Sequence, residues 1–167
     1  MIPVYIALGC NVEPCKKYLT TAVDLLQTLG TITKIASLYR SSAYGVENQP
    51  DFFNSACLLN TNFLPLDLLE GLKDIEKKIG RKERFHWGPR EIDLDIIFYD
   101  NEIINENELS IPHSDYKNRR FVLQPLAEIA EYFIPPGESK NLQTVLYECP
   151  DVTHVKLEIK DWYKKWK

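Results

Sequence analysis

The chain has 167 residues, of which 44% are hydrophobic and 26% are charged. This composition is typical of one soluble domain and unlike that of disordered, collagen-like or membrane-spanning chains. Its 20 lysines and arginines stand against 24 aspartates and glutamates, which is unlike a protein that holds nucleic acid by neutralising phosphates.

The N-terminal segment predicts a strand followed by a helix. Residues 4–8 alternate in character and lead into a tight turn at Gly9-Cys10-Asn11. Apolar residues then recur at helical spacing from Leu19 to Leu29. We expect this helix to begin at Pro14 and to end at Gly30.

Two further strands are predicted at residues 32–39 and 53–60, which are rich in β-forming residues. The connection between them, residues 40–51, is long for a hairpin and contains Gly45 and Pro50. A long connection inside a compact domain is usually functional, so we expect a loop that covers a ligand.

A second helix follows, with apolar residues at helical spacing from Leu68 to Ile79 and a stop at Gly80. After a basic loop at residues 81–90, residues 92–99 predict a strand that turns at Asp100-Asn101. No repeat or long linker interrupts this pattern, so we expect a single domain over residues 1–167.

The element order up to residue 99 is strand, helix, strand, strand, helix, strand. This order predicts a ferredoxin-like α+β fold, in which an antiparallel sheet carries both helices on one face and leaves the other face free. The C-terminal part adds helices near 121–129 and 141–147 and a strand at 155–159. These additions give the fold a tendency toward three layers.

The four cysteines lack metal-ligand spacing, and Met1 leads directly into an apolar strand without a signal peptide. We therefore expect reduced thiols, a cytoplasmic location and no association with a membrane. The cysteines are Cys10, Cys15, Cys57 and Cys149.

Asp93 and Asp95 form the strongest functional signal. Residues two apart in a strand share a face, so both carboxylates point to the same side. Two ionised carboxylates this close repel each other unless a cation lies between them, and their hard oxygen ligands suit Mg²⁺. The alternative is the solvated face of an edge strand. The strand is otherwise apolar on both sides, with Ile97 and Tyr99 expected on the carboxylate face, which favours the metal site.

The loop before the aspartates is cationic in a chain that is acidic overall, which indicates a phosphate guest. A solvated basic loop is the alternative. Trp87-Gly88-Pro89 could let the loop fold over a ligand, although a loop tryptophan can equally fill a core. The cationic residues are Arg81, Lys82, Arg84, His86 and Arg90.

Two other clusters are less specific. Phe52 and Asn54 share a face at the start of a strand, where they could stack on and hydrogen-bond a flat heterocycle, or could simply belong to core and turn. Residues 111–121 gather His113, cations and an aromatic residue, and a structural histidine is the alternative there.

With these motifs assembled, the chain resembles the 6-hydroxymethyl-7,8-dihydropterin pyrophosphokinase family, folate-pathway enzymes that move a pyrophosphoryl group from ATP to a pterin hydroxymethyl oxygen. The resemblance extends from the first strand to about Glu131, and Cys10, His86 and Ser114 depart from the family pattern. It rests on Gly9-Cys10-Asn11, Tyr39-Arg40, residues 49–54, Ile75-Glu76 with Gly80-Arg81, residues 90–95, and Pro112-His113 with Asn118-Arg119.

The resemblance implies a role for each matched residue. Asp93 and Asp95 would hold two Mg²⁺ ions. Catalytic contacts to phosphate and loop closure would come from Arg81, Arg84, Arg90 and Trp87, with help from His86. The ATP site would comprise Leu69, Glu76, Arg90, Ile96, Ser110, His113 and Arg119. The pterin would lie between Phe52 and Phe121, with its edge read by Ser41, Ser42, Tyr44 and Asn54.

The implied reaction is attack of the pterin oxygen on the β-phosphorus of ATP with release of AMP, by a monomer whose partners are these two small molecules and not nucleic acid. Two alternatives remain at this point. One is an RNA-binding module with the same strand order, which the acidic balance and the missing aromatic strand motif oppose. The other is a Mg²⁺-dependent nucleotidyl or phosphoryl transferase with a different acceptor.

Overall fold

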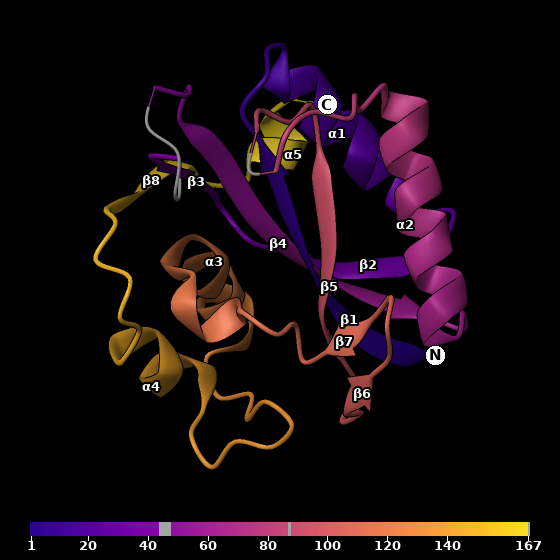
Figure 1. The fold of residues 1–167 in the computed structure, drawn as a ribbon, viewed down its shortest axis with the longest axis vertical. Helices are drawn as coiled ribbons and strands as arrows, with labels where there is room; N and C mark the ends of the chain where they lie inside the picture. Colours follow the sequence, from indigo (N-terminus) through magenta and orange to yellow (C-terminus); the bar gives the residue numbers. More distant parts are fainter. Residues whose placement is uncertain (44–47, 87, 167) are drawn as a thin grey trace.

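The computed structural model describes residues 1–43, 48–86 and 88–166. Within them, six strands form an antiparallel sheet in the order β5-β1-β4-β3-β8, with β2 also paired to β4 (Figure 1). A short hairpin lies beside β5. The sheet strands are β1 (Ile2–Cys10), β2 (Thr31–Ile35), β3 (Leu38–Ser41), β4 (Phe52–Thr61), β5 (Asp93–Tyr99) and β8 (Val155–Ile159), and the hairpin strands are β6 (Ile104–Asn105) and β7 (Ser110–Ile111).

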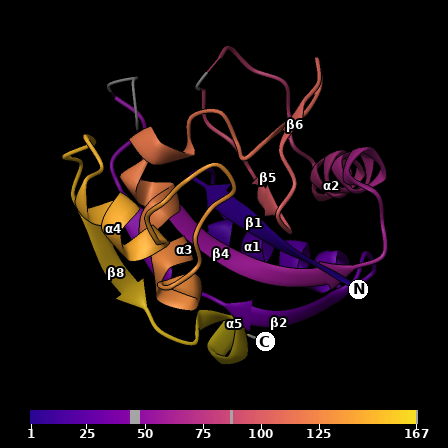
Figure 2. The ribbon, with the colours of Figure 1, turned by 90° about the horizontal axis from the view of Figure 1, so that it is seen from below.

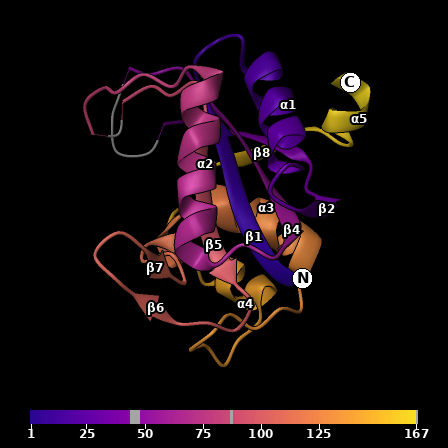
Figure 3. The same cartoon turned by 90° about the vertical axis from the view of Figure 1, so that its right-hand side faces the viewer.

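Helices α1 (Cys15–Leu26) and α2 (Pro65–Ile79) lie side by side (Figure 3) and share one apolar core with the sheet. Helices α3 (Arg120–Ala130) and α4 (Leu142–Tyr147) pack together away from α2 and bury a second core (Figure 2). The remaining helical segments are a 3₁₀ turn, η1 (Tyr116–Asn118), and α5 (Trp162–Trp166). None of the helices in the described residues is long and apolar enough to cross a membrane.

This architecture confirms the ferredoxin-like α+β fold with a third layer. The second face of the sheet, expected to be free over the first 99 residues, is covered by α3, because apolar residues such as Leu123 and Leu126 on that helix pack on the sheet. The cover is partial, and it leaves one end of this face for the site described below.

Two local predictions were wrong, and one helix was missed. The helix predicted from Pro14 begins one residue later, at Cys15. Residues 32–39 form two strands rather than one, because the Ala36 carbonyl accepts hydrogen bonds from Trp162 Nε1 (3.0 Å) and Ser55 Oγ (3.0 Å). Helix α5, which brings the fully buried Trp162 to this break, was not predicted.

A bulge in β5 changes which residues face each layer. Tyr5 pairs with Phe98 while Ile6 pairs with Ile96, so Ile97 is the extra residue. The side-chain alternation therefore reverses after Ile97. Ile97 lies on the α3 side as expected. Tyr99 was also expected there, but it belongs to the α1–α2 core, and Phe98 lies on the α3 side in its place.

Cys10 and Cys15 form a disulfide that joins the end of β1 to the start of α1. The expectation of four reduced cysteines is therefore wrong for this pair. The turn between them brings their Cα atoms to 5.7 Å, a proximity that the spacing alone does not reveal. Cys57 and Cys149 are free and buried.

Candidate active site

The candidate site lies on the α3 face of the sheet, where β1 ends and β4 and β5 begin. Gly9 in β1 pairs with Asp93 on one side and with Asn54 on the other, and Ala7 pairs with Asp95 and Ala56. A side chain at Gly9 would project its Cβ to within 3.6 Å of Asn54 Oδ1. The small residues of β1 therefore form a low floor between the acidic strand and the start of β4.

Asp93 and Asp95 face the same side, as predicted, and both line a cavity of about 250 Å³ on this floor. Burial raises the pKa of Asp95 to about 6, and the nearby Asp93 carboxylate adds to this effect. A freely solvated acidic face would not have this property. The two carboxylates lie close together, so a bound cation would reduce the repulsion between them.

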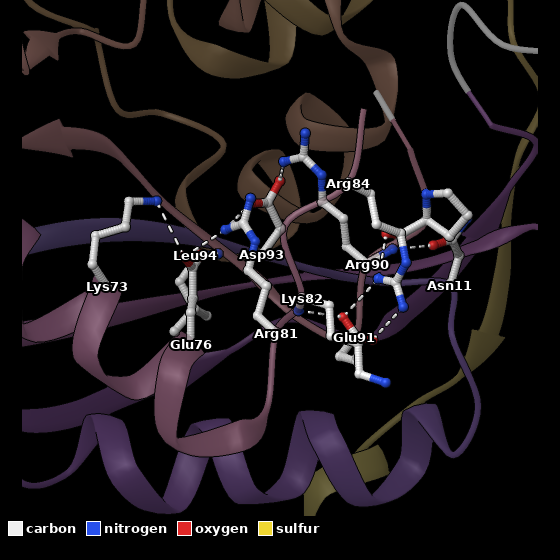
Figure 4. A network of polar contacts seen from close by, with 11 residues as sticks. Asn11, Lys73, Glu76, Arg81, Lys82, Arg84, Arg90, Glu91, Asp93 and Leu94 are labelled. Carbon is white, nitrogen blue, oxygen red and sulfur yellow. Dashed lines mark hydrogen bonds and ion pairs between the residues drawn. The ribbon is translucent and has the colours of Figure 1, made fainter. Parts of the chain in front are cut away.

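Asp93 is held by two arginines from the basic loop (Figure 4). Arg81 Nη1 lies 2.9 Å from Asp93 Oδ1, and Arg90 Nη1 donates to Asp93 Oδ2 at 2.7 Å. Gly80 ends α2 in the left-handed conformation (φ 102°), which lets the chain turn so that Arg81 N donates to the Glu76 carbonyl. Both loop ends thus deliver a guanidinium to the same carboxylate.

Glu76 is buried and joins α2 to the edge of the sheet at β5. Its Oε1 accepts a hydrogen bond from Leu94 N at 2.8 Å, and its Oε2 pairs with Arg81 and with Lys73 Nζ. Glu76 lines a cavity of about 550 Å³ that lies under the basic loop, and it does not line the smaller cavity along β5, which contains Lys73. The reason is that the edge amide of β5 offers Glu76 a buried partner.

Arg84 is turned toward Glu91, not toward the aspartates. Its two terminal nitrogens bind the two Glu91 oxygens at 2.9 and 2.7 Å, and Lys82 N donates to the same carboxylate. The hydrogen bonds from Arg84 lower the pKa of Glu91 to about 2. Sequence reasoning missed Glu91, and the only available signal was an acidic residue beside a cationic loop.

Asn11 was predicted in a turn and belongs to a motif of the family resemblance, but no role was predicted for its side chain, which joins both loops. Its Nδ2 donates to the Pro50 carbonyl at 3.1 Å, and its Oδ1 accepts from Arg90 N at 2.8 Å. Asn11 N also donates to the Arg90 carbonyl. Asn11 therefore fixes the backbone of Arg90 relative to the end of the 40–51 loop.

A second cavity, of about 310 Å³, lies along β5 and the 106–110 segment. It gathers most of the residues predicted for ATP: Leu69, Ile96, Ser110 and His113. Burial lowers the pKa of His113, and Arg119 lowers it further, so its neutral form is favoured. Arg119, held by Asp115 at 2.8 Å, lines the adjoining cavity with the aspartates.

The residues predicted for the pterin also lie together. The cavity that contains the aspartates is lined by Ser41, Ser42, Phe52 and Phe121, and a smaller neighbouring pocket contains Asn54. Asn54 Nδ2 donates to Ser41 Oγ at 2.9 Å, so the amide is oriented by β3. Tyr44 and Trp87, which were also predicted to belong to the site, lie outside the described residues.

The comparisons with known proteins agree on one family. The model of 7,8-dihydro-6-hydroxymethylpterin-pyrophosphokinase matches residues 5–131. The 2-amino-4-hydroxy-6-hydroxymethyldihydropteridine pyrophosphokinase of Aquifex aeolicus is 43% identical over 143 residues, which cover 86% of this chain and 89% of the relative. The Haemophilus influenzae protein of the same name is 38% identical over 159 residues, covering 94% and 99%.

The fold is also shared with solved structures. The wild-type Plasmodium falciparum HPPK-DHPS crystallised with pteroate superimposes with a TM-score of 0.73 at 16% identity. The aligned region covers 88% of this chain and 42% of that larger one. At this identity the likeness supports the fold alone.

Proposed function

The chain belongs to the 7,8-dihydro-6-hydroxymethylpterin-pyrophosphokinase family, and from this premise we propose that the two cavities around Asp93 and Asp95 bind ATP and the pterin side by side. The family assignment gives the reaction, which is transfer of a pyrophosphoryl group from ATP to hydroxymethyldihydropterin in folate biosynthesis. It replaces both alternatives drawn from the sequence, an RNA-binding module and a transferase with another acceptor.

We propose Asp93 and Asp95 as ligands of two Mg²⁺ ions. Within residues 1–43, 48–86 and 88–166, no group of three or more His, Cys, Asp or Glu side chains is arranged to hold a metal. Two carboxylates would leave most coordination positions to water and substrate phosphates, which is how Mg²⁺ is usually held. The raised pKa of Asp95 fits this assignment, since a divalent cation would offset the repulsion between the two groups. When bound, the ions would neutralise phosphate charge.

The nucleotide fits the cavity along β5. Leu69 and Ile96 offer apolar surfaces for a base, whereas Ser110 and His113 offer hydrogen-bonding groups. From there a polyphosphate would run toward the aspartates, where Arg81, Arg90 and Arg119 provide the guanidinium groups that bind phosphate oxygens.

The pterin fits the cavity at the start of β4. Phe52 and Phe121 both line it and provide the two aromatic faces for a flat bicyclic ring. Asn54, Ser41 and Ser42 provide donors and acceptors at the ring edge. The hydroxymethyl group would then point at the aspartates, which line the same cavity.

In the proposed chemistry, the hydroxymethyl oxygen forms a bond to the β-phosphorus and loses its proton to water, the bond from that phosphorus to the oxygen that bridges it to the α-phosphorus breaks, and AMP leaves with that oxygen. The protein aligns the two substrates and places guanidinium charge where negative charge builds up. Closure of the 81–90 loop, including Arg84, would exclude water. We expect ATP to bind first, because the loop residues that contact its phosphates also border the pterin cavity.

The observation that carries this proposal is the register of β1, which places Asp93 and Asn54 on opposite sides of Gly9. The test is AMP formation from ATP and 6-hydroxymethyl-7,8-dihydropterin with and without Mg²⁺, followed by chromatography. We expect equimolar AMP and pterin diphosphate that depend on the metal. Equal activity after removal of all divalent ions would contradict the metal assignment. We further propose a cytoplasmic monomer, which gel filtration and cell fractionation would test.

A further inference from the structure

Asp93 has an arginine on each of its two carboxylate oxygens. Arg81 Nη1 lies 2.9 Å from Oδ1 and Arg90 Nη1 lies 2.7 Å from Oδ2. All three side chains are about three-quarters shielded from solvent, with exposed fractions of 23–25%. These pairs are therefore screened less than surface pairs would be.

We propose that Arg81 and Arg90 are exchangeable counter-ions of Asp93, which a divalent cation must displace and which the nucleotide polyphosphate draws away. This inference rests on the proposed function, in which the same carboxylate holds metal and the same arginines bind phosphate. It makes metal and nucleotide binding mutually dependent, so that Asp93 takes up metal efficiently only when phosphate oxygens are there to receive the arginines.

The distances explain why cation and arginine compete. A Mg²⁺ ion binds a carboxylate oxygen at roughly 2.0–2.1 Å. A guanidinium nitrogen 2.7 to 2.9 Å from the same oxygen would then lie about 4 to 5 Å from the metal, where two like charges repel strongly at low effective dielectric. Either the arginine turns away or the metal binds weakly.

The exchange requires only side-chain rotation. Arg90 N and O are both hydrogen-bonded to Asn11, and Arg81 N is bonded to the Glu76 carbonyl. The backbone of each arginine is thus fixed close to the aspartates. Arg81 also contacts the Glu76 side chain, which gives it a second anionic partner, so we expect Arg90 to be the more easily exchanged of the two.

Asp95 provides an internal contrast. Among the ion pairs of the described residues, none within 4 Å involves Asp95, and Lys73 and Arg119 act on it at longer range. Among these residues, no ion pair within 4 Å therefore competes with a cation for the Asp95 oxygens, whereas each Asp93 oxygen carries an arginine. The two arginines are therefore counter-ions of Asp93 and not of Asp95, the other proposed metal ligand.

The test measures Mn²⁺ binding to the protein alone by electron paramagnetic resonance, then repeats the titration with a non-hydrolysable ATP analogue. In Arg90→Gln we expect Mn²⁺ alone to bind about tenfold more tightly than in the wild type, within the range of ordinary coupling between sites. The enhancement of Mn²⁺ affinity by the analogue should fall by a similar factor. Arg81→Gln should change both quantities in the same direction.

Two matched variants separate charge at Asp93 from other effects. Arg90→Lys retains the positive charge, so its affinity for Mn²⁺ alone should stay close to that of the wild type. Lys140→Gln removes a positive charge from an exposed pair with Glu148 and should leave Mn²⁺ affinity unchanged. Circular dichroism confirms that each variant is folded before the titrations are compared.

The outcomes are distinguishable. If Arg90→Gln and Arg81→Gln bind Mn²⁺ alone no more tightly than the wild type does, the counter-ion proposal is overturned while the metal site stands. If the wild type gains no protein-bound Mn²⁺ even with the analogue, and Asp93→Asn behaves identically, the metal site of the proposed function fails.

Discussion

Two arginine–carboxylate clusters lie within residues 81–95, and they differ in how firmly the carboxylate is held. Glu91 is 4% exposed, receives both ends of the Arg84 guanidinium and also accepts from Lys82 N. Asp93 is more exposed and receives one contact from each of two arginines, Arg81 and Arg90.

The difference indicates two tasks for the same chemistry. A two-pronged guanidinium–carboxylate pair with an added backbone donor fixes geometry, and the same hydrogen bonds lower the pKa of Glu91. Single contacts from separate arginines are easier to exchange for phosphate or metal. This difference supports the proposal that the Glu91 cluster stabilises the loop and that the Asp93 cluster binds ligand.

The largest effect is expected at the aspartates. Asp93→Ala and Asp95→Ala should each lower turnover by about 10³-fold or more, because each removes a proposed metal ligand. Little loss of fold is expected for Asp95→Ala, since it removes a buried charge beside a second carboxylate, whereas Asp93→Ala also leaves Arg81 and Arg90 without their shared partner and should cost more stability. Steady-state AMP release and thermal unfolding measure the two effects. Near-normal Mg²⁺-dependent turnover in either variant would place the metal elsewhere.

The next effect separates the two clusters directly. Arg90→Ala should lower kcat by about 10²-fold, because it removes a donor expected at the transferring phosphates. Arg84→Ala should lower kcat by less than about tenfold, since Arg84 acts on the loop through Glu91 and not on the phosphates. Equal losses in the two variants would mean that Arg84 leaves Glu91 during the reaction.

The sequence predicted those parts of the site that follow from local periodicity. The alternation in β5 placed Asp93 and Asp95 on one face, and the start of β4 placed Phe52 with Asn54. It did not predict the partners of Arg84, because a guanidinium can bind any carboxylate within reach and only the folded loop selects Glu91.

Other features were missed because they depend on contacts that form only in the folded chain. The break at Ala36 requires Trp162, which is 126 residues away. The bulge at Ile97 is set by pairing with β1. The disulfide is local, because it joins Cys10 to Cys15, but it depends on the path of the turn between them. None of these leaves a periodic signal in its own segment.

The variant Glu91→Gln tests whether the Glu91 cluster stabilises the fold. The pKa of Glu91 is lowered from 4.5 to about 2, so its contribution to stability is complete above pH 4.5 and is lost as the pH falls toward 2. We expect Glu91→Gln to lower the free energy of unfolding by about 2 kcal/mol at pH 7, with a smaller difference at pH 3. Urea unfolding at both pH values measures this.

The exposed Glu83 lies in the same loop, and Glu83→Gln is the matched control. It should change the free energy of unfolding by less than about 0.5 kcal/mol at either pH. A destabilisation by Glu91→Gln that is the same at pH 3 and pH 7 would show that packing, and not the ion pair, accounts for its effect.

The smallest effect, of opposite sign, is expected for Asp95→Asn. The pKa of Asp95 is raised from 3.8 to about 6, so folding favours the protonated form, and the stability gained from it is present below pH 3.8 and lost as the pH rises through 6. Asp95→Asn should therefore raise the free energy of unfolding at pH 8, by about 1–2 kcal/mol, and make little difference at pH 4. Asp74→Asn, on the exposed part of α2, should show no such gain at pH 8. If Asp95→Asn stabilises the protein equally at pH 4 and pH 8, the burial of an ionised carboxylate next to Asp93 is not the cause, and the contrast between Glu91 and the aspartate pair loses its electrostatic basis.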